Sequence, residues 1–149
     1  MVYPNVSDSV SVPAGTPDKT LFVCVDNTYG KSDPQTGTLV SLDDCAMGYW
    51  TEKNLASSRG YDCEWLMARY HGKIVGVWEI DRAKGWLKPS ALPKKSWPSD
   101  KPTPPPLRRG CVLLPVSKAS ENRFLGKEVH LGRCQNTLRG YFIGKPKAI

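Results

Sequence analysis

Tryptophan, tyrosine and basic side chains are the residues of this 149-residue chain with the clearest chemical potential. Aromatic rings stack on nucleobases, which contributes roughly 1–3 kcal/mol per base, and Lys and Arg side chains bind phosphates. Three aromatic residues are our candidates for such contacts: Tyr49, Trp50 and Trp86. Trp65 and Trp78 lie in strongly apolar runs and are predicted to be core, whereas Trp50 and Trp86 fit a contact surface as well as a core.

Charge is unevenly distributed along the chain. Residues 1–81 contain six Lys/Arg and eleven Asp/Glu, a net −5, whereas residues 82–149 contain fifteen and three, a net +12. This asymmetry favours a polyanionic partner for the basic half, although two halves that neutralise each other on a folded surface fit the composition equally well. We predict that seven basic residues form one continuous positive surface: Lys84, Lys88, Lys94, Lys95, Arg108, Arg109 and Arg123.

Sequence motifs for catalysis or cofactor binding are missing. The chain has no glycine-rich phosphate loop, no GxSxG elbow and no HExxH. Its five cysteines form no CxxC pair, and His130 with Cys134 offers half of a zinc site without a second half. We therefore expect a protein that is not an enzyme, with reduced thiols, no cofactor and no metal.

A β-hairpin is the strongest structural signal. Asp62–Tyr70 and Lys73–Ile80 are rich in branched and aromatic residues, and His71-Gly72 between them suits a two-residue turn. Strict alternation in the second run places apolar side chains on both faces, with Ile74, Trp78 and Ile80 on one and Val75 and Val77 on the other. Such a strand is covered on both sides or curled into a small barrel.

Shorter elements surround the hairpin. Residues 1–19 are predicted to be a flexible arm, and residues 20–149 a single domain that contains a Pro/Lys-rich loop at 85–106. The expected fold is α+β, with a small, curled, mostly antiparallel sheet and short helices. Further expected elements are strands at Thr20–Val25, Cys111–Val116, Arg123–Leu131 and Arg139–Lys145, and helices at Leu42–Met47 and Glu52–Ala56, capped by Ser41 and Thr51.

Four segments of the sequence resemble small bacterial domains of the PUA-like superfamily, which is related to the PUA, EVE, ASCH, YTH and SRA domains. They are GYW at 48–50, ARYHGKIVGVWEID at 68–81, NRFLGKEV at 122–129 and YFIGKPK at 141–147. The resemblance covers residues 20–147 except the region 85–120. It implies a small β-barrel that binds RNA or DNA, and several such barrels hold one extruded base in an aromatic pocket.

The sequence and the resemblance together predict a non-catalytic nucleic-acid-binding domain. Its pocket is expected to be lined by Trp50 and Trp86, with Tyr49 and Arg123 close by. The alternative is a small interaction or regulatory domain that meets an acidic protein through its basic C-terminal half, and a third reading is an ASCH-type hydrolase. DNA and RNA are not distinguished, and the oligomeric state is left open.

The sequence also bears on location. No apolar run approaches the roughly 20 residues that span a bilayer, and the first residues lack a basic start followed by an apolar centre. We therefore expect a cytoplasmic protein that does not contact membranes.

Overall fold

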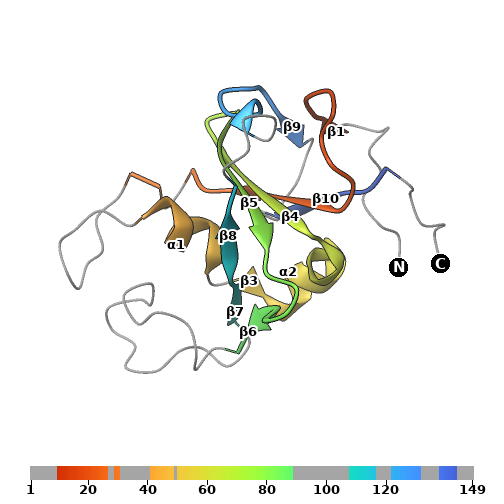
Figure 1. Cartoon of the computed structure of the whole chain (residues 1–149), viewed down its shortest axis with the longest axis vertical. Helices are drawn as coiled ribbons and strands as arrows, with labels where there is room; N and C mark the ends of the chain where they lie inside the picture. Colours follow the sequence, from red (N-terminus) through yellow and green to blue (C-terminus); the bar gives the residue numbers. More distant parts are fainter. Residues whose placement is uncertain are drawn as a thin grey trace.

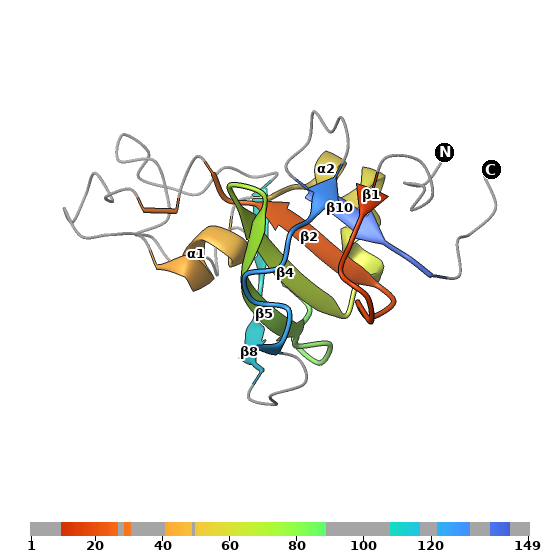
Figure 2. The ribbon, with the colours of Figure 1, turned by 90° about the horizontal axis from the view of Figure 1, so that it is seen from above.

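A five-stranded sheet forms the centre of the molecule (Figures 1 and 2). The computed structural model describes residues 10–26, 29–30, 41–48, 50–88, 108–116, 122–131 and 138–143. The strand order is β10-β2-β4-β5-β8, in which β2 and β4 are parallel and the other neighbours antiparallel. The strands are β2 (Thr20–Cys24), β4 (Trp65–Tyr70), β5 (Lys73–Ile80), β8 (Leu113–Pro115) and β10 (Leu138–Tyr141).

The predicted hairpin is confirmed, because β4 and β5 pair antiparallel around His71 and Gly72. Their φ angles are 50° and 81°, so both turn residues adopt the left-handed conformation that a type I′ turn requires. The backbone N–H of His71 donates to the Asp26 carboxylate at 2.9 Å, which ties the turn to the end of β2. The strand start expected at Asp62 is wrong, since Gly60–Asp62 forms a short 3₁₀ helix, η1.

A β-bulge explains why β5 is apolar on both faces. Ala68 pairs with Gly76 but Arg69 pairs with Ile74, so Val75 is an extra residue in β5. Ile74 therefore joins Val77 on one face, while Val75 packs with Trp78 on the other. The predicted assignment of side chains to faces is thus corrected at Ile74 and Val75, because strict alternation does not hold across a bulge.

Two short helices lie on one side of the central sheet. α1 (Leu42–Met47) is capped by Ser41, whose hydroxyl accepts from the backbone N of Asp44 at 3.1 Å. α2 (Glu52–Ser57) is capped by Thr51, whose hydroxyl accepts from the backbone N of Asn54 at 3.2 Å. Both predicted helices and both predicted caps are confirmed.

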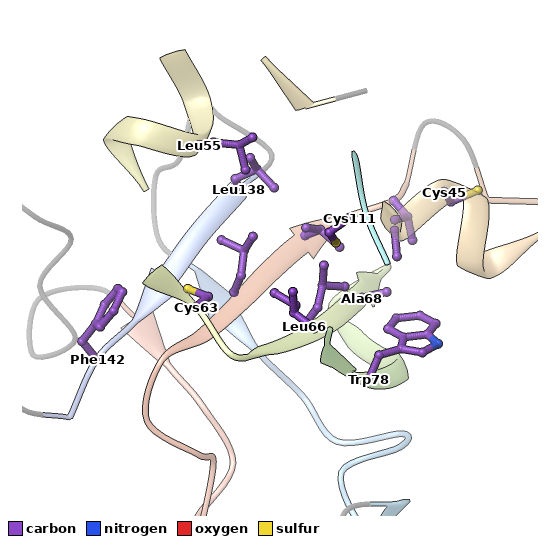
Figure 3. Packing of buried hydrophobic residues seen from close by; sticks show 14 residues of the cluster. Cys45, Leu55, Cys63, Leu66, Ala68, Trp78, Cys111, Leu138 and Phe142 are labelled. Atoms are coloured by element: carbon purple, nitrogen blue, oxygen red, sulfur yellow. The ribbon is translucent and has the colours of Figure 1, made fainter. Parts of the chain in front are cut away.

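Each face of the central sheet carries its own buried cluster, because side chains alternate along β2 and β4. The first cluster, which we call the main core, lies under the helices and is shown in Figure 3. It contains Leu21, Val23, Leu66, Ala68 and Trp78 from the sheet, with Cys45, Ala46, Leu55 and Cys111 from elements that cover it. The second cluster, on the other face, contains Phe22, Met67, Ile74, Val77, Phe124 and Val129.

A small sheet at one end of the molecule contains β3 (Trp50–Thr51), β7 (Arg108–Cys111) and β6 (Trp86–Leu87), with β7 in the middle. Figure 1 shows these strands at the lower end. The strand predicted at Cys111–Val116 is interrupted at Val112, and its two parts belong to different sheets. β8 pairs with the outer edge of β5, whereas β7 turns away to hold β3 and β6.

The opposite end is formed by β1 (Val10–Ser11) and β9 (His130–Leu131), which pair antiparallel. Val10–Ser11 belongs to the stretch predicted as an arm, and residues 1–9 lie outside the described part. The strand predicted at Arg123–Leu131 is wrong for most of its length, because residues 122–127 form turns stabilised by local backbone hydrogen bonds. The predicted last strand is present but shorter, at Leu138–Tyr141.

The α+β class is confirmed, with a fold dominated by strands and few short helices. The strands that the structure describes form three separate sheets and do not close into a barrel, so the predicted barrel is not confirmed. Of the predicted 85–106 loop, residues 89–106 lie outside the described ranges, and Trp86–Leu87 is strand β6. No helix in the described ranges is long and apolar enough to span a bilayer.

Candidate functional site

The small sheet brings three predicted site residues together. Trp50 on β3 pairs with Arg109 on β7, and Trp86 on β6 pairs with Cys111 on β7. Residues directly opposite each other in a sheet share a face, as do residues two apart on one strand. Trp50, Arg109 and Trp86 therefore project from the same face, although β7 separates the two tryptophan strands by roughly 10 Å.

Tyr61 is the ring that contacts Trp86. The two ring centroids lie 6.0 Å apart with an interplanar angle of 77°, an edge-to-face arrangement that aromatic pairs favour. Tyr61 is 37% exposed and Trp86 is partly buried against the main core. The indole Nε1 of Trp86 is buried and has no hydrogen-bond partner in the described ranges. A buried N–H without an acceptor costs roughly 1–3 kcal/mol of stability.

An ion pair lies beside the two rings. Nε of Arg109 donates to Oε1 of Glu52 at 2.7 Å, and Nη2 of Arg109 contacts the same oxygen. Glu52 is the first residue of α2, where its charge is favourable near the helix N-terminus and the Thr51 cap fixes its position. The side chains of Arg109 and Glu52 are 28% and 41% exposed, so both remain within reach of a ligand.

Tyr61 is electrostatically coupled to this pair. Burial raises the pKa of its phenol, the charge of Arg109 lowers it, and that of Glu52 raises it. The phenol is therefore a neutral hydrogen-bonding group at physiological pH. Arg82 holds the Tyr61 backbone, because its Nη1 donates to the Tyr61 carbonyl at 3.2 Å and to the Cys63 carbonyl at 3.0 Å. We call Tyr61, Trp86, Arg109 and Glu52 the ring–ion-pair site.

Trp50 is anchored to the fold. Its indole Nε1 donates to the Ala46 carbonyl of α1 at 2.9 Å, and its ring is partly buried against the main core. This side chain connects β3 to α1. Of the two alternatives that the sequence left open for Trp50, the contacts favour core packing.

The other predicted cations are distributed over different places. Lys84 and Lys88 are exposed on either side of β6, and the backbone of Arg108 belongs to β7. Tyr49, Lys94 and Lys95 lie outside the described residues. The continuous positive surface that we predict for the basic residues therefore stays a prediction.

Arg123 is not part of the ring–ion-pair site. Its guanidinium carbon lies 4.8 Å from the ring centroid of Phe124, which belongs to the second cluster, and its Nη2 donates to the Gly15 carbonyl at 3.5 Å. Trp50 and Trp86 pack against the main core, on the other face of the central sheet. The structure thus separates Arg123 from the two tryptophans that the sequence grouped with it.

The described residues contain no group of three or more His, Cys, Asp or Glu that could hold a metal ion. Cys24, Cys63 and Cys111 are free thiols. Burial raises the pKa of Cys63, and it raises the pKa of Cys111 to about 12. Both are neutral thiols at physiological pH, which makes them poor nucleophiles and poor metal ligands.

Comparisons with protein-family models, with curated proteins and with solved structures gave no match for this chain. The PUA-like resemblance therefore rests on the four sequence segments alone.

Sequence reasoning missed Tyr61, Glu52 and Arg82. Tyr61 follows a glycine in a polar stretch, and Glu52 has the ordinary role of an acid in the first turn of a helix. Nothing in their local sequence indicates a partner far along the chain. The non-local pairing of β7 with β3 brings Arg109 to Glu52, and the pairing of β6 with β7 sets Trp86 nearby.

Proposed function

We propose that this protein is a non-catalytic nucleic-acid-binding domain of PUA-like type, and that it holds one unstacked base of a single strand at the ring–ion-pair site. The observation that supports this proposal most directly is that Tyr61 and Trp86 lie next to the Arg109–Glu52 ion pair. Aromatic faces bind any base by stacking, and charged side chains distinguish bases by hydrogen bonding.

The chemistry of the site supports recognition of a base edge. The Glu52 carboxylate can accept a hydrogen bond from the exocyclic amino group of cytosine or adenine. Arg109 can donate to acceptors such as O6 and N7 of guanine. Ring surface, an acceptor and a charged donor group within one small area suit a flipped or single-stranded base.

Phosphate contacts would come from those lysines of the basic C-terminal half that lie next to the ring–ion-pair site. Lys84 and Lys88 are exposed next to the site, and residues 82–149 carry a net +12. Exposed lysines beside a stacking surface neutralise backbone phosphates and release counterions, so binding of this kind weakens as salt rises. The alternative, an acidic protein partner, would use the same lysines but would not need the rings.

The test is fluorescence anisotropy with labelled eight-nucleotide single strands of DNA and of RNA. We expect Tyr61→Ala to weaken binding about 5- to 150-fold, since one stacked base contributes roughly 1–3 kcal/mol. The matched control is Tyr29→Ala: Tyr29 also forms an edge-to-face pair, with Tyr70 at 5.0 Å, but it follows β2 and lies away from this site. Tyr29→Ala should leave the affinity unchanged.

Salt dependence gives a second readout. The slope of log affinity against log salt should become shallower by about one unit in Lys84→Met and again in Lys88→Met. If the parent protein binds neither strand, or if Tyr61→Ala and Tyr29→Ala bind equally well, the proposed function is wrong. Displacement of the labelled strand by a polyglutamate peptide as effectively as by unlabelled strand would favour the protein partner instead.

A further inference from the structure

A groove lies on the face of the central sheet opposite the ring–ion-pair site. It has a volume of about 410 Å³ and is lined by Pro13, Ala14, Arg123, Phe124 and Lys127. This volume is within the range of roughly 300–1,000 Å³ that small-molecule sites occupy. Arg123 and Lys127 are the charged residues of its lining, and both are exposed.

One wall of the groove is held firmly to the hairpin. The backbone N–H of Gly126 donates to the Ile74 carbonyl at 2.8 Å, and the N–H of Ile74 donates to the Lys127 carbonyl at 2.9 Å. Phe124 is 2% exposed and packs into the second cluster. The turn that carries both cations is therefore fixed at its base by hydrogen bonds and by a buried ring.

The other wall is a tight turn before β2. The backbone N and the hydroxyl of Thr16 both donate to the Pro13 carbonyl, at 3.2 Å and 2.6 Å. Gly15 within this turn has φ +82°, and a Cβ at this position would collide with Nη2 of Arg123. The turn thus needs glycine for its backbone conformation and for the close approach of the guanidinium.

Arg123 is pre-oriented by these walls. Its guanidinium lies over the Phe124 ring, and Nη2 is the nitrogen that contacts the Gly15 carbonyl. Neither Arg123 nor Lys127 forms an ion pair with a carboxylate in the part of the chain that the structure describes. Two cations that line a groove beside apolar residues, with no carboxylate partner among the described residues, are complementary to an anion that carries an apolar group.

We propose that this groove binds a small phosphate monoester that carries an aromatic or nucleoside group. The planar guanidinium of Arg123 matches two phosphate oxygens, and Lys127 supplies the second positive charge that a phosphate dianion requires. Pro13 and Ala14 offer the apolar surface for the attached ring. The proposal is independent of the base-binding function, because the two sites lie on opposite faces of the sheet.

Isothermal titration calorimetry on the full chain tests this with three probes: adenosine monophosphate, adenosine and inorganic phosphate. Adenosine monophosphate should bind at least tenfold more tightly than either of the other two, because only it uses both the cations and the apolar wall. Arg123→Gln and Lys127→Met should each weaken its binding by at least tenfold. Arg123→Lys keeps the charge but loses the planar fork, and it should also weaken binding.

Two variants at or beside the ring–ion-pair site serve as controls. Lys84→Met and Tyr61→Ala should leave the binding of adenosine monophosphate unchanged, and Lys127→Met should leave the binding of the eight-nucleotide strands unchanged. Absence of binding by the parent protein would overturn the proposal, as would equal binding of adenosine. Loss of adenosine monophosphate binding in Tyr61→Ala with no loss in Arg123→Gln would assign the ligand to the ring–ion-pair site and would also overturn it.

Discussion

Replacing Trp50 by alanine distinguishes a contact residue from a structural one. The sequence predicts Trp50 as a wall of the binding pocket, and a residue with that role alone can be removed with little loss of stability. In the structure its ring packs against the main core and its Nε1 donates to the Ala46 carbonyl at 2.9 Å. We therefore expect Trp50→Ala to destabilise the fold.

The magnitude follows from these two contacts. Aromatic side chains bury about 150–250 Å² on folding, and the lower value corresponds to about 4 kcal/mol at about 25 cal/mol per Å². This is an upper value, because the unfolded chain already buries part of its apolar surface. The hydrogen bond to Ala46 adds about 1 kcal/mol. Since Trp50 is only partly buried, we expect a loss of about 3 kcal/mol in the free energy of unfolding for Trp50→Ala.

Urea denaturation of Trp50→Ala and Trp50→Phe measures both contributions. Trp50→Phe retains most of the ring contact but loses the donor, so its expected cost is about 1–2 kcal/mol. Trp78→Ala serves as the reference for a core tryptophan, because Trp78 is 7% exposed and should lose about 3–5 kcal/mol. A change below about 0.5 kcal/mol in Trp50→Ala would refute the structural role and return Trp50 to the list of candidate ligand contacts.

Two further perturbations have expected outcomes. Burial raises the pKa of Cys63 and Cys111, the latter to about 12, so between about pH 9 and pH 12 the unfolded chain releases thiol protons that the folded chain keeps. The free energy of unfolding should therefore fall with rising pH in this window, by up to about 1.4 kcal/mol per pH unit for each thiol. Urea titrations at several pH values should show a shallower fall for Cys111→Ala than for the parent protein. A Cβ at Gly140 would collide with the backbone carbonyl of Ser58 and lie 2.7 Å from Cε2 of Phe142, so Gly140→Ala should lower the free energy of unfolding by at least about 2–3 kcal/mol. Gly72 has open space around it but a φ of +81°, so Gly72→Ala should lower it by about 1 kcal/mol. Equal shifts of the melting temperature for the two variants would contradict this.

Local sequence signals predicted the local structure well. Ser41 and Thr51 each stand directly before a helix, because a short hydroxyl side chain satisfies a backbone N–H that the first helical turn leaves free. His71-Gly72 gave the correct turn because glycine accepts a positive φ without a steric penalty. In these cases the interacting groups are at most four residues apart, so the sequence contains both partners in one window.

Features that depend on distant pairing could not be predicted. The apolar run at Cys111–Val116 reads as one strand, yet Val112 interrupts it and its halves serve two sheets. The segment at 122–131 carries strand-forming residues, but its backbone groups bond to Ile74 and Gly72 and to one another in turns. The ring–ion-pair site depends on the same non-local pairing, so half of its members, Tyr61 and Glu52, had no local signal.

The bulge at Val75 connects the fold to both proposed sites. Without it, Ile74 would point toward the main core and the second cluster would lose one of its buried side chains. With it, both faces of β5 are apolar near the hairpin, and both must be covered. The helices and the small sheet cover one face and present the ring–ion-pair site, whereas the turns at 122–127 cover the other and present Arg123 and Lys127. Because the central sheet lies between the two sites, a single-site substitution should leave the other site's binding intact, and simultaneous loss of both would indicate a folding defect.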